Sequence, residues 1–390
     1  EHVYFFTQPG ALKSLKIEQA GKVKSIALTR LPALNELVLK GAEQLQSLDI
    51  TKLTELTKLE LSGAKDLTTI DLSKNTKLET LDIRGTKLAS LDLSKHTAMK
   101  YTWVYENQLS TIKLSPATLS LWVYGNKLTS LDVSMATGLY SIDARDNALT
   151  TLTLATDKTK YHELKLSSNG LTNLDLQNAT ELKTLEIGKN ANLAILNLRG
   201  CTKLQKLDMS NCTAFKELKQ AGETAWFLDG CTALTDFRLY GTGLDASNLS
   251  KLYCHLHKVT SGKLYVADKT NQTSLTEAQK SGTNIAKENG WTVLASDGTE
   301  FTGSTKTCAD LVPNNVPVIA LVIDGNLTVK LRSSAKELWI EDGQGNYEYK
   351  EVNPGEEITL SHNALLPQPR KFHGKISAFD ISNQNAVQRL

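Results

Sequence analysis

The residues with the clearest capacity for chemistry are aromatic side chains at alternate positions in two short segments. Tyr101, Trp103 and Tyr105 form the first set, and Trp122 and Tyr124 form the second. Alternate side chains of an extended strand point to one face, so each segment predicts a short row of rings on one surface. Trp and Tyr are enriched among the residues that dominate protein interfaces, and the chemistry these rows predict is ligand binding.

Catalytic and metal-binding patterns are lacking in the sequence. It contains no G-x-S-x-G, H-E-x-x-H, P-loop or strand-linked G-x-G-x-x-G motif. Cys254, His255 and His257 resemble a ligand cluster, but positions two apart on a helix point to different sides, and paired zinc spacing is missing. We therefore expect no enzyme, no catalytic residue, no metal site and no cofactor.

Three cysteines begin the same local phrase, Cys-Thr followed by two residues of which the second is Leu or Phe. They are Cys201, Cys212 and Cys231. Asn, His or Ala fills the equivalent turn elsewhere in the chain, so the phrase predicts a buried side chain packed into a turn rather than a reactive thiol.

These segments belong to a repeat. The pattern L-x-x-L-x-L recurs about every eleven residues from Leu12 to roughly Leu244, and two kinds of string alternate to give a full repeat of about 21 or 22 residues. Such units bury their apolar edges against their neighbours, which predicts a solenoid. The outward residue lies between the last two apolar positions, and along the array it is Val38, Glu60, Asp82, Trp103, Trp122, Asp143, Lys165, Glu186, Asp208 and Arg238.

The repeats resemble the short leucine-rich repeats of internalin-like bacterial surface proteins, whose consensus fits residues 139–154 and 161–176 closely. The resemblance covers about 60% of the chain. It implies a horseshoe or arc with parallel strands on the concave side and short strands on the convex side. It also implies a non-enzymatic protein of the cell surface or secretome, used in adhesion or host interaction.

The predicted site is an aromatic platform on the concave side. Strands about 4.8 Å apart would place Trp103 beside Trp122 and Tyr105 beside Tyr124. If six rings were each half exposed, the patch would exceed roughly 450 Å². The predicted ligand-binding residues are Tyr101, Trp103, Tyr105, Trp122, Tyr124, Tyr140, Arg84, Arg145, Asp82 and Asp143.

Three interpretations of the platform stay open. It binds a protein ligand, or it binds a glycan by stacking Trp103 and Trp122 on sugar rings, or the chain is a scaffold without a specific concave ligand. In the last case cross-strand aromatic pairing would merely stabilise a stretch in which the repeat shortens to about 19 residues.

The rest of the chain predicts further parts. Residues 1–244 form the solenoid and 245–295 an α/β cap, with helices at 245–257 and 274–288 and strands at 263–267 and 291–294. A linker covers 296–315, and 316–390 form a small antiparallel β-sandwich of immunoglobulin-like type. Its strands, at 318–323, 327–331, 337–340, 347–352 and 357–360, are separated by turns, of which Asp342–Asn346 falls short of a calcium loop. Residues 378–390 fit either the start of another repeat or an ordinary edge strand.

Composition excludes some partners. The 44 basic and 42 acidic residues leave a formal charge of +2 without a basic run, so a nucleic-acid partner is not expected. No apolar stretch of about 18 residues predicts a membrane span, and the first residues lack the basic start of a signal peptide. The expected location, extracellular or on the outer cell surface with a leader or lipid anchor already removed, follows from the resemblance.

Overall fold

The computed structural model describes residues 12–218, 226–306 and 308 in full, and the backbone of the strands between Val318 and Arg389. The chain divides into two compact units. The first contains residues 1–196 and 200–212, and the second contains residues 197–199 and 213–390.

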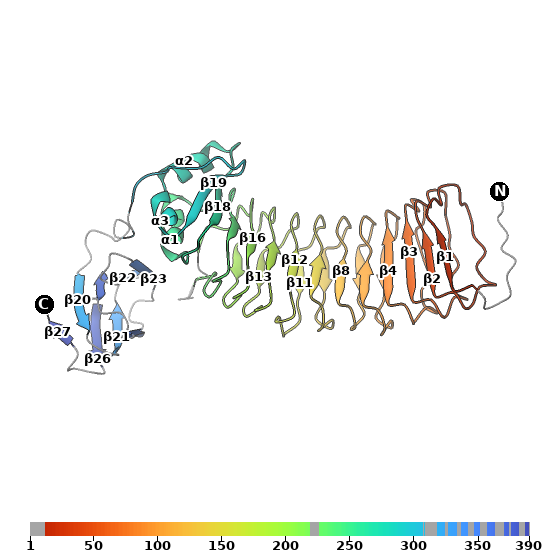
Figure 1. Ribbon diagram of the computed structural model, residues 1–390, viewed down its shortest axis with the longest axis horizontal. Helices are drawn as coiled ribbons and strands as arrows, with labels where there is room; N and C mark the ends of the chain where they lie inside the picture. Colours follow the sequence, from red (N-terminus) through yellow and green to blue (C-terminus); the bar gives the residue numbers. More distant parts are fainter. Residues whose placement is uncertain are drawn as a thin grey trace. The chain divides into compact units, whose positions relative to one another are not determined.

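The first unit is a solenoid of parallel strands, as predicted (Figure 1). One strand of each repeat pairs with the corresponding strand of the next repeat, and we call the resulting sheet the front sheet. These strands are β1 Ser14–Ile17, β2 Glu36–Leu39, β3 Lys58–Ser62, β4 Thr80–Arg84, β6 Tyr101–Trp103, β8 Ser120–Trp122, β10 Ser141–Asp143, β12 Glu163–Lys165, β14 Thr184–Glu186 and β16 Lys206–Asp208. The strand pairing of neighbouring repeats is in register, with Leu59 opposite Leu81 and Leu164 opposite Leu185.

Shorter strands lie on the other side of the repeats between residues 90 and 197. They are β5 Ser90–Asp92, β7 Thr111–Lys113, β9 Ser130–Asp132, β11 Thr151–Thr153, β13 Asn173–Asp175 and β15 Ile195–Asn197. In this set β5 pairs with β7 and β9 with β11 in parallel, and β13 pairs with β15. The predicted second set of strands is therefore confirmed.

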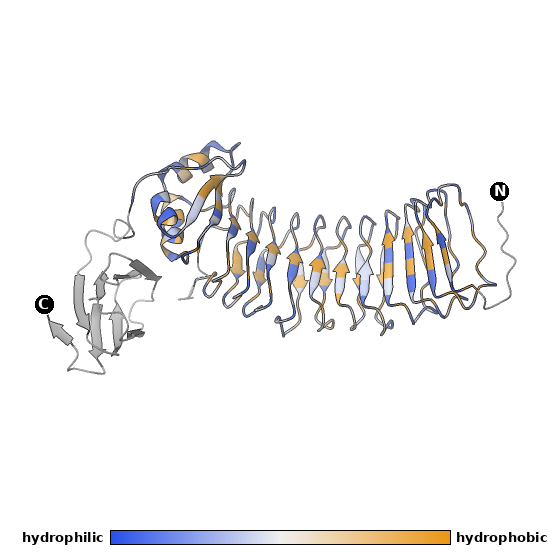
Figure 2. Cartoon of the chain, viewed as in Figure 1, coloured by the Kyte–Doolittle hydropathy of each residue, from blue (hydrophilic) through white to orange (hydrophobic). Residues whose placement is uncertain are grey.

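The core of the unit lies between these two strand layers. Leucines at the repeating positions, such as Leu59, Leu81 and Leu185, are fully buried. Figure 2 shows the alternation of apolar and polar residues along the front strands. Because each repeat buries its leucines only against its neighbours, the repeats stabilise one another in sequence.

A column of asparagines, three of them buried and two half-buried, fixes the turn that follows the front strand. Each Nδ2 donates to a carbonyl oxygen of the preceding repeat and to one of its own, and each Oδ1 accepts a backbone N–H of the preceding repeat. The members are Asn107, Asn126, Asn147, Asn169 and Asn190. The column satisfies backbone groups that would otherwise be buried without a partner.

The three cysteines of the shared phrase are buried and not disulfide-bonded, as predicted. Cys212 occupies the position of the asparagine column one repeat after Asn190 and donates to the carbonyl oxygen of Ile187 at 3.4 Å. Cys201 and Cys231 lie in the other half-repeat and donate to the carbonyl oxygens of Leu176 and Leu198. Each thiol therefore acts as a weak donor inside a turn.

The second unit begins with β17 Asp236–Arg238 and continues through α1 Ala246–His255, β18 Gly262–Ala267, α2 Gln272–Lys280, α3 Thr283–Glu288 and β19 Trp291–Ala295. Strands β17, β18 and β19 pair in parallel. The single helix expected at 274–288 is wrong. Two helices replace it, because the chain leaves helical geometry at Ser281 and restarts with Gly282 as the N-cap of α3.

A disulfide that the sequence did not predict joins Cys254 of α1 to Cys308. Residues just before it, inside the predicted linker, are hydrogen-bonded to the same unit. Ser304 Oγ donates to the carbonyl oxygen of Lys280, and the Lys306 backbone N–H donates to Asn284. At least this part of the segment is held against its own unit.

The last part of the chain forms two antiparallel sheets. Strands β20 Val318–Ile323, β22 Glu337–Glu341, β23 Tyr347–Glu351, β25 Arg370–His373 and β27 Val387–Arg389 form one, and β21 Leu327–Ser333, β24 Glu357–His362 and β26 Ile376–Ile381 form the other. The five predicted strands are all present. The predicted turns at 324–326, 342–346 and 352–356 lie outside the described residues.

The pairing of the last strands distinguishes the two interpretations of residues 378–390, another repeat or an edge strand. β26 pairs with β21, and β27 pairs antiparallel with β20 at the end of its sheet. Residues 387–389 are thus an edge strand rather than the parallel strand of another repeat. Among the described residues, none of the helices has the length and apolar character needed to cross a membrane.

Candidate functional site

Parallel pairing brings Trp103 and Trp122 together at the middle of one outward row. Trp103 of β6 lies opposite Trp122 of β8, with Asp82 of β4 next to Trp103 and Asp143 of β10 next to Trp122. The predicted order of the outward ladder is confirmed from Val38 to Asp208, although Val38, Asp82 and Asp143 are buried. The row therefore reads carboxylate, indole, indole, carboxylate across four consecutive front strands.

The two indoles stack on each other. Their ring centroids are 5.1 Å apart and the ring planes differ by 27°. This separation is close to the spacing of neighbouring strands, about 4.8 Å. Each ring plane is therefore roughly perpendicular to the sheet, with one face against the neighbouring ring. The pair exposes ring edges to solvent rather than two open ring faces.

A second row, two residues further along the strands, is a closed stack. The Tyr105 and Tyr124 rings are 4.4 Å apart at 15°. The Arg84 guanidinium lies 5.7 Å from the Tyr105 ring centroid, and the Arg145 guanidinium lies 5.7 Å from that of Tyr124. Arg84 also donates to the Tyr105 hydroxyl at 2.5 Å. The tyrosine pair thus has a cation over each outer face, an arrangement favoured by the ring quadrupole.

The two aspartates differ in their bonding. Asp143 accepts two hydrogen bonds from the Arg145 guanidinium, from Nε at 2.9 Å and from Nη2 at 2.7 Å. Asp82 Oδ1 lies 3.5 Å from Arg84 Nε but has no hydrogen-bond partner among the described residues. Burial raises the pKa of Asp82, against the lowering effect of Arg84.

Glu60 and Asp82 lie opposite each other on β3 and β4, and nearby cations compensate their repulsion. Arg84 Nη2 lies 3.3 Å from Glu60, and Lys58 and Lys40 lie 3.7 Å and 3.5 Å from it. This end of the front sheet is therefore a network of ion pairs, and the aromatic rows interrupt it.

Exposure is less uniform than the sequence predicted. Trp122 is 38% exposed, Tyr101, Trp103 and Tyr124 are half-buried, and Tyr105 is only 8% exposed. The expectation of six half-exposed rings is wrong for Tyr105, because Tyr124, Trp122 and Arg84 cover it. We use the name aromatic cluster for Tyr101, Trp103, Tyr105, Trp122 and Tyr124.

Tyr140 lies apart from the aromatic cluster. It is 37% exposed, precedes β10, and packs on His162 at 5.9 Å and 46° rather than on a ring of the cluster. His162 occupies the equivalent position one repeat later and was not predicted. The repeat period alone would have found it, because equal positions in successive repeats lie side by side.

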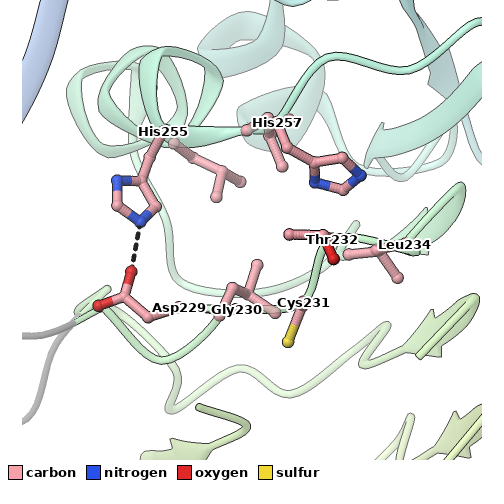
Figure 3. Close-up of a pocket in the computed structure, with 10 residues that line it drawn as sticks. Asp229, Gly230, Cys231, Thr232, Leu234, His255 and His257 are labelled. Atoms are coloured by element: carbon pink, nitrogen blue, oxygen red, sulfur yellow. Dashed lines mark hydrogen bonds and ion pairs between the residues drawn. The ribbon is translucent and has the colours of Figure 1, made fainter. Parts of the chain in front are cut away.

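A second candidate is a pocket of about 80 Å³ in the second unit, lined by residues 228–234 and the end of α1. Figure 3 shows His255 and Asp229 at one side of it, where His255 Nε2 lies 2.7 Å from Asp229 Oδ1. Trp226 stacks on the His255 ring at 4.1 Å. Cys254 is in the disulfide, so the apparent cluster around His255 and His257 loses its thiolate. No group of three metal-ligating side chains occurs in the part of the chain that the structure describes.

No known protein-family model matches the chain, and no curated protein matches it in sequence. Solved structures do match. The functional domain of InlJ from Listeria monocytogenes, whose description mentions a cysteine ladder, aligns over 89% of this chain and 77% of its own at 19% identity and a TM-score of 0.48. The internalin InlF of the same species aligns over 70% and 86% at 22% identity and a TM-score of 0.45.

A leucine-rich-repeat protein of Leptospira interrogans aligns over 70% of this chain and 83% of its own, at 19% identity and a TM-score of 0.43. What decides the fold is the chain's own register of front strands, buried leucines and asparagine column. The chain has the leucine-rich-repeat fold. In fold it is similar to the internalins, as the sequence predicted.

The leucine-rich-repeat fold is generally used for binding, since its parallel strands present one continuous row of side chains. In this chain most outward positions of that row are charged and form an ion pair with a residue of the same or of a neighbouring repeat, for example Glu186 with Lys206 at 2.6 Å. The aromatic cluster is the exception. Its half-buried rings and its one exposed indole can lose water to a partner without breaking an ion pair.

Proposed function

We propose that this protein is a non-enzymatic binding protein of the bacterial cell surface or secretome, which binds a protein ligand through the front sheet of its leucine-rich repeats. The observation that carries the proposal is Trp122, an exposed indole at the centre of a leucine-rich-repeat face whose other outward residues are mostly ion-paired. Interface hot spots are enriched in Trp, Tyr and Arg, and all three meet at this place.

The ring geometry favours a protein over a glycan. A sugar stacks on an open ring face, but the inner faces of Trp103 and Trp122 cover each other, and the tyrosine faces are covered by rings and guanidinium groups. Ring edges and hydroxyl groups suit the mixed apolar and polar surface of a protein. A sugar could stack only on the outer face of Trp122, which makes an extended glycan platform a poor description of the site.

The disulfide supports the proposed location. Disulfides persist in oxidising compartments and are rare in reducing cytosol. The Cys254–Cys308 pair ties α1 to the segment that follows β19. We therefore expect the pair to be oxidised in protein recovered from the outside of the cell, which peptide mapping without reductant would show. A reduced pair in freshly isolated surface protein would contradict the proposed location.

Binding to cells tests the proposed role. Fluorescently labelled protein is applied to cultured epithelial cells and to neighbouring bacteria, before and after treatment of the cells with trypsin or with glycosidases. Trp122→Leu is compared with Met135→Ala, because Met135 is 72% exposed and lies outside the front sheet. Loss of a hot spot costs about 2 kcal/mol, so binding should fall roughly 30-fold in Trp122→Leu and stay unchanged in Met135→Ala.

Each other result contradicts a part of the proposal. Full binding by Trp122→Leu excludes the aromatic cluster as the site. Binding that survives trypsin but is lost with glycosidases identifies a glycan ligand. If the protein binds neither epithelial cells nor neighbouring bacteria, the proposed adhesive role is wrong.

A further inference from the structure

The two aromatic pairs of the cluster differ in how their outer faces are covered. Tyr105 and Tyr124 carry a guanidinium over each outer face, from Arg84 and Arg145. Trp122 stacks on Trp103 with one face, and no cation lies over Trp122 among the described residues. On the Trp103 side, Tyr101 leans against the indole at 5.8 Å and 44°. The outer face of Trp122, turned towards β10, is thus the uncovered end of the row.

The chain repeatedly covers aromatic faces with guanidinium groups. Besides Arg84 and Arg145, Arg238 lies 4.8 Å from the ring centroid of Tyr265 in the second unit. In two of these pairs an aspartate two residues before the arginine holds the guanidinium, as Asp143 holds Arg145 and Asp236 holds Arg238. Trp is the best acceptor of a cation among the aromatic side chains. Yet the most exposed indole of the cluster has no such partner among the residues that the structure describes.

A carboxylate lies next to this uncovered face. Asp143 lies directly beside Trp122 in the strand register. The pKa of Arg145 is raised by the hydrogen bonds to Asp143 and, more weakly, by the charges of Glu186 and Asp146. The pKa of Tyr124 is raised to about 12, first by burial and then by Tyr105, Glu106 and Asp143. Arg145 is paired with Asp143, and Lys165 lies on the other side of Asp143 in the row. The Asp143 carboxylate is the negative group next to the uncovered ring face, and it would attract a cation placed on that face.

From this arrangement we infer that the protein ligand inserts a cationic side chain, an arginine guanidinium in particular, against the outer face of Trp122 beside Asp143. The inference rests on the proposed function and names the chemistry of its central contact. Arginine fits better than lysine because its planar group stacks on a ring while its edge donates to a carboxylate. Asp143 is 7% exposed, and its carboxylate accepts three hydrogen bonds from Arg145, which leaves it acceptor capacity for one more donor.

The isolated contact can be measured without knowing the ligand. The protein is labelled with 5-fluorotryptophan, which gives one fluorine resonance for each of its five tryptophans. Trp122→Leu assigns the resonance of Trp122 by its disappearance. The probes are the peptide acetyl-Gly-Arg-Gly-amide and the same peptide with citrulline in place of arginine, which has nearly the same shape without the charge.

We expect the arginine peptide to shift the Trp122 resonance with millimolar affinity. The citrulline peptide should bind about two- to fivefold more weakly, which corresponds to an exposed cation–π contact. High salt should reduce this difference. In Asp143→Asn the preference for the arginine peptide over the citrulline peptide should shrink.

Equal affinity for the two peptides overturns the inference, and so does a shift that appears only at other tryptophans. An equal shift caused by methyl glucoside at the same concentration would identify Trp122 as a sugar-stacking residue instead. The outcome is separable from that of the proposed function. If Trp122→Leu abolishes binding to cells but arginine shows no preference, only the inference fails. If the arginine preference is present but Trp122→Leu binds cells normally, only the proposed function fails.

Discussion

Replacement of Asn190 by Ala should cost about 4 kcal/mol of unfolding free energy. The side chain is fully buried, and its Nδ2 donates to the carbonyl oxygens of Leu166 at 3.0 Å and Ile187 at 2.7 Å, while its Oδ1 accepts from the Leu171 backbone N–H at 3.1 Å. The three lost hydrogen bonds contribute about 1 kcal/mol each, and the buried backbone groups left without a partner add about 1 kcal/mol in total. Water that enters the gap would lower this sum.

Two further variants calibrate the measurement. Asn190→Cys imitates Cys212, whose thiol donates one hydrogen bond from the equivalent position, so its loss should be intermediate, about 2–3 kcal/mol. Asn173→Ala changes an exposed asparagine and should stay within about 0.5 kcal/mol of the unsubstituted protein. Urea unfolding followed by circular dichroism gives the free energies, and hydrogen exchange should show faster exchange of the Leu171 amide. A loss below about 1 kcal/mol, or an unchanged Leu171 amide, would refute the role assigned to the column.

Three other substitutions and one pH dependence should change the stability of the protein in a predictable direction. Gly63→Ala should lose about 1–2 kcal/mol in urea unfolding, because Gly63 has φ +74° and an added Cβ would lie 3.2 Å from the Gly41 Cα; an unchanged midpoint would contradict this. Asp143→Asn should lose about 1 kcal/mol, because it weakens the ion pair between the buried Asp143 and the partly exposed Arg145. Asp82→Asn should leave stability equal or higher, because burial raises the pKa of Asp82. The reverse order of the two variants in thermal unfolding would contradict this reasoning. Hydrogen bonds from Ser94 hold the pKa of Asp92 at about 2, below its value in the unfolded chain. The contribution of Asp92 to the free energy of unfolding is therefore complete above about pH 4 and is lost as the pH falls through 2. A melting temperature that falls only between pH 7 and 5 would exclude this contribution.

The period of the sequence was enough to predict the front sheet and the neighbours across it. In a solenoid of parallel strands, equal positions of successive repeats are opposite one another, so the pairs Trp103–Trp122 and Tyr105–Tyr124 follow from spacing alone. The same logic applied one position earlier would have paired Tyr140 with His162. Local sequence therefore determines these contacts almost completely.

Other features depend on packing that no period encodes. The burial of Tyr105 results from the way in which its neighbours lean over it, and the edge-on stance of the rings results from stacking at strand spacing. The Cys254–Cys308 disulfide joins residues 54 apart, one of them outside any regular element. The division of the predicted helix at Gly282 likewise depends on tertiary contacts, because Ser250 Oγ accepts the N–H of Gly282.

The two aromatic rows divide stability and binding between them. In the tyrosine row each ring face is covered from within the chain, by a ring or by a guanidinium, so that row gains its energy in the unbound protein. The tryptophan row is covered on its inner faces only, and its outer end keeps an indole 38% exposed beside a carboxylate. The ring face that stays exposed in the unbound protein can still be buried by a partner, and that burial contributes to the binding free energy. This difference in exposure between the two rows, rather than the number of aromatic residues, distinguishes a binding contact from a stabilising one. Substitution of Trp122 should therefore weaken binding far more than it lowers the free energy of unfolding.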